Sequence, residues 1–142
     1  MAISSSLVFF MNLVKTQTIV ARRFDCGLGG LGFSELMILY HLSQAPETKL
    51  RRIDLAEKIG LTASGVTRLL LPMEKIGLVS KEAHARDARV SYVVLAPGGA
   101  EKLREGLERA ELFCADVIPA GKVKKVEELS TTLVELSQAI KY

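Results

Sequence analysis

Ser64, Thr67 and Arg68 lie at helical spacing shortly after Thr62, and their side chains could contact DNA. Thr62 is a favourable helix N-cap residue. A small hydroxyl can approach a base or a phosphate, while an arginine can bind a guanine edge or a phosphate oxygen. These residue types favour a helix face that enters a DNA groove. The alternative is an ordinary exposed helix that carries one arginine.

Positive charge is concentrated around these side chains. Residues 50–95 contain eight basic and five acidic residues, whereas the whole 142-residue chain has 19 basic and 16 acidic ones. The excess of three in this segment equals the formal net charge of the chain, +3. Because DNA phosphates attract such a local excess, the segment is the candidate DNA-binding region.

Two helices joined by a glycine turn would position these side chains. The first is predicted over residues 50–59 and ends at Gly60, which can adopt the left-handed conformation. The second begins after the cap at Thr62. Residues 78–83 and 89–95 predict the two strands of a hairpin. Together these elements predict a mainly α-helical winged helix-turn-helix with a small β-hairpin wing, which places one helix in a major groove.

Further helices are predicted on both sides of this core. The apolar spacing indicates helices over residues 6–24, from a cap at Ser34 to Pro46, and over residues 98–118. The last helix repeats apolar residues at intervals of three and four: Val126, Leu129, Leu133, Leu136 and Ile140. Such a stripe must be buried against a partner, and a second copy of the chain can supply one. We therefore expect N- and C-terminal dimerisation helices in residues 1–32 and 98–142, around a DNA-binding domain in residues 33–97.

Several function classes are disfavoured by the residue pattern. The cysteines, Cys26 and Cys114, are far apart, so neither a disulfide framework nor a zinc site is expected. The two histidines have no ligand-spaced neighbours, so no metal or other cofactor is expected. No nucleophile, base and orienting group occur together, so the chain is not expected to be an enzyme. The apolar run near the N-terminus is too short to span a membrane, and a cytoplasmic protein is expected.

Gly27, Gly29 and Gly32 match the spacing of a dinucleotide-binding fingerprint. That fingerprint requires a strand before the glycines and a parallel strand after the helix. The preceding segment is predicted to be helical, and no parallel strand follows. We interpret the glycines as a linker between the first helix and the DNA-binding domain.

Five motifs carry a family resemblance over residues 33–107. In order, they are FSELMIL from Phe33, LAEKIGLT from Leu55, VTRL from Val66, MEKIGLV from Met73 and DARV from Asp87. In this order and spacing they resemble the MarR family of bacterial transcriptional regulators. The resemblance implies a homodimer that binds double-stranded DNA at a near-palindromic operator, most often as a repressor. In many relatives a small aromatic ligand or an oxidant lowers the affinity for DNA.

Arg86, Asp87 and Arg89 resemble the Asp-x-Arg wing of this family. There the arginine reaches toward the minor groove, while the aspartate orients the loop through an ion pair. Narrow minor grooves attract arginine because their potential is strongly negative. His84 stands where relatives often carry an acidic residue, so the shape and charge of this wing depart from the family pattern. A solvated hairpin tip is the alternative interpretation.

Other positions leave alternatives open. Arg51 and Arg52 begin the first predicted helix of the pair, where they either contact phosphates or balance nearby acids. Pro72 either bends the recognition helix or limits its base-reading turns to a shorter rigid unit.

The signal to which the chain responds is also open. Tyr40 and His41 are the candidate effector-binding residues. Cys26, placed in the glycine-rich linker near two arginines that favour a thiolate, is a candidate redox sensor. A winged protein-interaction module that does not read DNA is a further alternative.

Overall fold

A computed structural model describes residues 1–27, 30–87 and 89–141, with only the backbone of residues 26 and 27. The chain forms two compact units, Met1–Arg109 and Ala110–Tyr142. Within the described residues, no helix combines the length and the hydropathy needed to cross a membrane.

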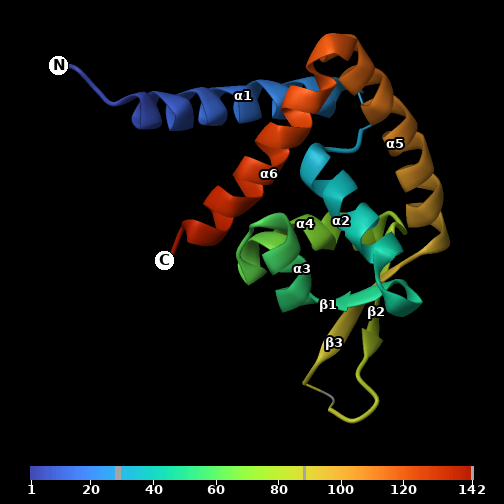
Figure 1. Ribbon diagram of the computed structural model, residues 1–142. Helices are drawn as coiled ribbons and strands as arrows, with labels where there is room; N and C mark the ends of the chain where they lie inside the picture. The colour runs from blue at the N-terminus through green and yellow to red at the C-terminus, as the bar shows by residue number, and fades with distance from the viewer. Residues whose placement is uncertain (28–29, 88, 142) are drawn as a thin grey trace. The chain divides into compact units, whose positions relative to one another are not determined.

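The fold is mainly helical with one small sheet, as the sequence predicts (Figure 1). In chain order the elements are α1 (Ser5–Gly27), α2 (Phe33–Gln44), a 3-10 turn (Pro46–Thr48), β1 (Lys49–Arg51), α3 (Arg52–Ile59), α4 (Ala63–Lys75), β2 (Val79–Ala83), β3 (Ser91–Leu95), α5 (Pro97–Val117), a second 3-10 turn (Ala120–Lys122) and α6 (Val123–Ala139). The second unit contains the end of α5 and all of α6. The first unit contains the complete winged helix-turn-helix.

The core of the first unit lies among α2, α3 and α4. Fully buried side chains from all three helices meet there: Ile38, Leu39, Leu42, Leu55 and Val66. Each helix buries one apolar stripe, and no polar or charged residue is buried among the described ones. This core fixes the angle at which α4 leaves the glycine turn.

Leu55 and Ile53 on α3 provide a matched pair for testing this core. Leu55 is fully buried, whereas 63% of the surface of Ile53 is exposed. We expect Leu55→Ala to lower the free energy of unfolding by about 2–5 kcal/mol, because the substitution leaves a cavity. Ile53→Ala should change it by no more than about 0.5 kcal/mol. Urea unfolding of both variants measures the difference, and equal effects would contradict the assignment of the core.

The sheet has the strand order β1-β3-β2, with both pairs antiparallel. The predicted hairpin is confirmed as β2 and β3, and its tip projects away from α2, α3 and α4 (Figure 1). The prediction of a helix over residues 50–59 is wrong at its start. Residues 49–51 form β1, in which Leu50 pairs with Val93, and α3 begins only at Arg52. Pairing with the free edge of β3 satisfies backbone groups that a helix start would leave unpaired.

The start of α2 also differs from the prediction. Gly32, not Ser34, is the N-cap residue. The carboxylate of Glu35 accepts a hydrogen bond from the Gly32 amide at 2.9 Å, which supplies half of a capping box. Helix α1 extends to Gly27, so the backbone of Cys26 lies in its last turn and not in a linker.

Helix α5 packs closely on α2 at Gly106. A Cβ atom at this glycine would lie 2.8 Å from Cδ1 of Leu36 and 3.3 Å from Cδ2 of Leu31. Both leucines are buried. A side chain at position 106 would therefore push α5 away from the helix-turn-helix core.

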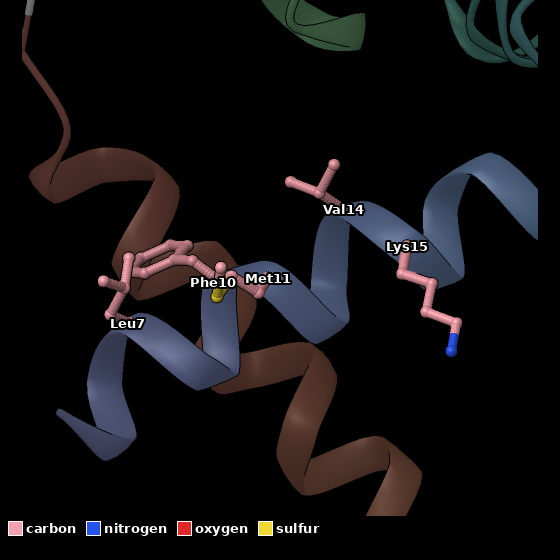
Figure 2. A pocket seen from close by; sticks show the side chains of 5 residues that line it. All are labelled: Leu7, Phe10, Met11, Val14 and Lys15. Carbon is pink, nitrogen blue, oxygen red and sulfur yellow. The ribbon is translucent and has the colours of Figure 1, made fainter. Parts of the chain in front are cut away.

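Apolar surface remains exposed on the helices that flank the winged core. Along α1, Leu7, Phe10, Met11 and Val14 line an apolar groove together with Lys15 (Figure 2). These four apolar side chains keep between 39% and 60% of their surface exposed. Helix α6 contains no buried residue, although Leu129 and Leu133 lie on its apolar stripe.

Cys114 does not pack in the core. Although Cys114 lies on α5 among apolar residues, its side chain is exposed. Leu112 and Val117 on the same helix are exposed as well. The end of α5 therefore belongs to the exposed apolar surface and not to the core of the chain.

Candidate nucleic-acid interface

The turn between α3 and α4 has the predicted construction. Gly60 adopts the left-handed conformation, with φ 73° and ψ 27°, which a glycine reaches without strain. The hydroxyl of Thr62 accepts a hydrogen bond from the Gly65 amide at 3.0 Å and caps α4. The oxygen of Thr62 is also 3.3 Å from the hydroxyl of Ser64. The first turn of the recognition helix is thus fixed by its own side chains.

Helix α4 buries one face and exposes the other. Val66, Leu70 and Met73 are buried, whereas Ser64 and Arg68 are exposed. Among the described residues, Arg68 makes no hydrogen bond or ion pair. A guanidinium without an acidic partner is available for a base edge or a phosphate.

Thr67 and Arg52 contact each other across the two helices. Nη1 of Arg52 donates a hydrogen bond to the hydroxyl of Thr67 at 3.3 Å, and that hydroxyl donates to the carbonyl oxygen of Ala63 at 3.0 Å. Nε of Arg52 is buried and has no partner among the described residues. Arg52 therefore holds α3 against the first turns of α4, and both hydrogen-bonding directions of the Thr67 hydroxyl are engaged.

Arg51 has a different environment. It occupies the N-cap position of α3, and its Nε donates to Oδ2 of Asp54 at 2.9 Å. The Asp54 carboxylate raises the pKa of the guanidinium through this hydrogen bond. Since a positive charge opposes the dipole at a helix N-terminus, the ion pair offsets that repulsion. Arg51 therefore balances an acid. Its guanidinium is exposed, so its remaining N–H donors face solvent.

Pro72 lies inside α4 and does not end it. The helix continues from Ala63 to Lys75, although proline cannot donate to the carbonyl oxygen of Arg68. The amide of Ile76 donates to the Pro72 carbonyl oxygen at 3.2 Å, so the chain remains hydrogen-bonded beyond the proline. The turn that carries Arg68 therefore has one carbonyl group free of helix bonding.

The wing brings Arg86, Asp87 and Arg89 together in the loop between β2 and β3. Nε of Arg89 donates to Oδ1 of Asp87 at 3.2 Å, and the Arg89 amide donates to the same oxygen at 3.0 Å. These hydrogen bonds lower the pKa of the Asp87 carboxyl. Arg86 is exposed, and the Arg89 side chain keeps 91% of its surface exposed. The pairing of aspartate and arginine agrees with the geometry that the resemblance implies.

Lys49, Glu82 and Tyr92 brace the wing, and sequence reasoning missed them. Nζ of Lys49 lies 2.9 Å from the Glu82 carboxylate and 3.0 Å from that of Glu47. It also lies 4.8 Å from the centre of the Tyr92 ring. The contacts join β1 to the loop end of the hairpin, where Glu82 pairs with Tyr92. A three-residue strand gives no clear periodicity, so only the pairing with β3 reveals it.

The candidate effector residues lie on α2. The Tyr40 side chain is exposed, while His41 is half-buried and its ring lies 5.5 Å from that of Tyr40. Burial lowers the pKa of His41, and the positive charge of Lys58 on α3 lowers it further. The apolar groove of Figure 2 is lined by α1 residues and by neither of these two. Tyr40 and His41 are thus near the helix-turn-helix but outside that groove.

Two further sequence interpretations concern the residues between α1 and α2. The side chain of Cys26, the candidate redox sensor, lies outside the described residues, as does Gly29 of the glycine pattern. The glycine segment joins two helices, whereas a dinucleotide fingerprint follows a strand. Within the described part of the chain, no group of three or more histidine, cysteine, aspartate or glutamate side chains could hold a metal ion.

A capped recognition helix, a glycine turn and a braced hairpin define a protein of the winged helix-turn-helix class. The model of the MarR family matches residues 33–91. The predicted resemblance to the MarR family is confirmed over this segment. MarR-family proteins are transcriptional regulators and not enzymes, which agrees with the expectation from the residue pattern.

Known proteins resemble both the sequence and the fold. An uncharacterized HTH-type transcriptional regulator, YdgJ of Bacillus subtilis (strain 168), is 28% identical over 83 residues, which cover 58% of this chain and 48% of that protein. The chain thus matches about half the length of this curated relative. The transcriptional regulator BldR of Sulfolobus solfataricus has a TM-score of 0.83 at 24% identity, with 95% of this chain and 96% of that one covered.

A third similar protein was solved with DNA. Sco3205, a MarR family transcriptional regulator of Streptomyces coelicolor in complex with DNA, has a TM-score of 0.77 at 20% identity. The superposition covers 95% of this chain and 89% of that chain. At these identities the two structural likenesses concern the fold. They extend the likeness beyond the winged core to almost the whole chain.

Proposed function

We propose that this chain is a homodimeric transcriptional repressor that binds double-stranded DNA at a near-palindromic operator in the cytoplasm. In this proposal α4 enters the major groove and presents Ser64 and Arg68, with Thr62 and Thr67 at its first turns. Arg51 and Arg52 contact phosphates beside α4. Arg86, Asp87 and Arg89 form the wing that approaches the minor groove. The terminal helices of residues 1–32 and 98–142 hold together the DNA-binding domains of two chains. Each such domain, residues 33–97, is termed a reading head, or head.

The observation that carries the proposal is the exposed and unpaired guanidinium of Arg68 on a rigidly capped helix. Two other arginines of residues 50–95 have acidic partners, Asp54 for Arg51 and Asp87 for Arg89. Arg68 has none among the described residues. An isolated arginine beside small hydroxyl groups is the combination that base or phosphate contact requires.

The exposed apolar surfaces of α1 and α6 support the homodimer. Long amphipathic helices with an uncovered stripe are not stable alone in water, and a second copy offers the same surface in return. Two heads related by a two-fold axis would match two half-sites about one helical turn apart, roughly 34–36 Å.

Control by a small aromatic ligand is the further part of the proposal. The half-buried ring of His41 and the exposed ring of Tyr40 lie on α2, which packs on α3 of the reading head. A ligand that binds better to one arrangement of these helices would shift the population of DNA-binding dimers. Competition by aromatic carboxylates in a DNA-binding assay tests this step separately from DNA binding itself.

A gel shift with the DNA upstream of the gene tests the proposed function. We expect sequence-preferring binding at submicromolar protein that weakens steeply as salt is raised, since phosphate contacts release counterions. Binding that ignores sequence, or no binding at low salt, would contradict the proposal.

Arg89→Ala is expected to weaken binding to all DNA sequences to a similar extent. Removal of one phosphate-facing charge from each head should lower the slope of log K against log salt by about one per head. Arg104→Ala is the matched control, because Arg104 on α5 is also exposed and also paired with acids, Glu101 and Glu108. An unchanged slope in Arg89→Ala would remove Arg89 from the DNA-facing wing.

A further inference from the structure

The loop at the tip of the wing is closed by backbone hydrogen bonds. The amide of His84 donates to the carbonyl oxygen of Val90 at 2.9 Å, and the Val90 amide donates to that of Asp87 at 3.1 Å. The Arg89 amide is held by the Asp87 carboxylate. The amides of Arg86 and Asp87 point into the loop and need an acceptor there.

The imidazole of His84 supplies that acceptor. Its Nδ1 accepts a hydrogen bond from the Arg86 amide at 3.1 Å and another from the Asp87 amide at 3.2 Å. The ring is half-buried and stacks on Tyr92 of β3, with centroids 5.6 Å apart and planes inclined by 30°. The ring therefore packs against β3, while its Nδ1 holds two backbone amides of the loop.

This arrangement requires a neutral imidazole. Nδ1 accepts hydrogen bonds only when it carries no proton, so the proton of the neutral ring is on Nε2. In the protonated ring both nitrogens are donors, and Nδ1 would face two amide protons. Protonation would therefore release the two amides that define the path of the chain at Arg86 and Asp87.

We propose that His84 is a positioning residue for DNA binding, whose neutral imidazole holds the wing loop in the shape that presents Arg86 and Arg89. The proposal deepens the proposed function and rests on it. Its consequence is that affinity for DNA falls when the imidazole is protonated.

Charged groups face His84 both from its own loop and from the sheet. Asp87 would favour a protonated ring, but its carboxylate already binds the amide and the side chain of Arg89. On the sheet side, His84 and Lys49 both contact the Tyr92 ring, and Lys49 is paired with Glu47 and Glu82. Arg86 and Arg89 in the loop disfavour a further positive charge.

A protonated His84 would add one positive charge near DNA. At a partly exposed site that salt screens, such a charge contributes little to binding. Loss of the two hydrogen bonds to Nδ1 displaces the segment that carries both wing arginines. The loss of loop geometry therefore outweighs the gain in charge, and affinity falls on acidification.

Three substitutions at this position separate the acceptor from the charge. In His84→Asn the amide oxygen can occupy the place of Nδ1 and accept at every pH. In His84→Gln the amide lies farther out, near the place of Nε2, so it is the matched control. His84→Ala removes the acceptor altogether.

DNA affinity measured at several pH values for the wild type and these variants tests the proposal. We expect the wild type to bind roughly tenfold more weakly at about pH 5.5 than at about pH 7.5, since protonation removes both hydrogen bonds. His84→Asn should keep the neutral-pH affinity at both pH values. His84→Gln and His84→Ala should bind weakly at both. A wild-type affinity that stays flat or rises on acidification would overturn the proposal. The same fall in His84→Asn would also overturn it, because the fall would then come from another group, such as His41, the only other histidine.

Nuclear magnetic resonance of the free protein separates this proposal from the proposed function. The amide signals of Arg86 and Asp87 should shift with the titration of the His84 ring, and the neutral ring should be the Nε2–H tautomer. In His84→Asn the two amide signals should not move with pH. An Nδ1–H tautomer, or amides that ignore the titration, would overturn the role of His84 even if DNA binding is confirmed. If DNA binding fails while the amides follow the ring, the proposed function fails, and with it the role of His84 in DNA affinity.

Discussion

Leu133→Asp is expected to convert the dimer into a monomer and to reduce operator affinity by roughly 100-fold or more, because two linked heads bind far more tightly than one. Leu133 lies on the apolar stripe of α6 and keeps 38% of its surface exposed in the single chain. In an isologous dimer the substitution acts twice, and each new carboxylate would have to leave water without a partner.

Thr131→Asp is the control for this change. Thr131 lies on the opposite side of α6, and its hydroxyl donates to the carbonyl oxygen of Glu127 in an exposed position. It adds the same charge to the same helix, so the protein should stay dimeric. Light scattering measures the mass of each variant, and circular dichroism shows that α6 remains helical. A dimeric Leu133→Asp, or a Thr131→Asp that dissociates equally, would contradict the assignment of the dimer face.

Arg68→Ala is expected to lower specific DNA affinity by about 1–3 kcal/mol for each head, which is roughly 5- to 150-fold. The guanidinium has no acidic partner among the described residues, so the substitution leaves no unpaired acid behind. Stability should remain within about 0.5 kcal/mol of the wild type because the side chain is exposed. Arg104→Ala, with the same change in formal charge on α5, should bind as the wild type does.

The form of the loss in Arg68→Ala identifies the contact. If Arg68 binds a guanine edge, one position of the operator becomes tolerant to substitution and the salt slope stays unchanged. If it binds a phosphate, all sequences lose affinity equally and the slope falls by about one per head. Titration of operator variants at several salt concentrations distinguishes the two. Unchanged affinity would mean that this face of α4 does not contact DNA.

The sequence predicted the local geometry of the reading head well. The left-handed Gly60 and the Thr62 cap follow from rules that concern a few neighbouring residues, and both are confirmed. The strand β1 was missed because its three residues gain their structure from β3, more than forty positions away along the chain. Ser34 has the residue type of a cap, but the reach of Glu35 to the Gly32 amide decided the start of α2.

Charge counting along the sequence picks out the candidate DNA-binding segment but does not show which charges within it are unpaired. Arg51 and Arg89 contribute to the local excess, yet each is paired with an aspartate two or three residues away. Arg52 is drawn against α4 by Thr67, fifteen residues further along the chain. Only the folded arrangement shows that Arg68 has no acidic partner among the described residues, because ion pairing depends on distances that spacing alone does not fix.

The role of His84 in the wing also could not be predicted from the sequence. His84 looked like a departure from the family pattern that left the wing in doubt, whereas its Nδ1 occupies the acceptor position of the loop. A histidine and an acidic side chain can both accept backbone hydrogen bonds, so the structural role survives a change of residue type. What changes is the range of pH over which the acceptor exists.

Selection of bound fragments from genomic DNA, followed by a footprint and a count of protomers on the selected site, tests the central claim most directly. We expect one near-palindromic sequence with half-sites about one helical turn apart, occupied by two protomers. In Arg68→Ala the protection of both half-sites in the footprint should weaken together. Selection of no common sequence, or a single site occupied by one protomer, would contradict the account of two linked reading heads.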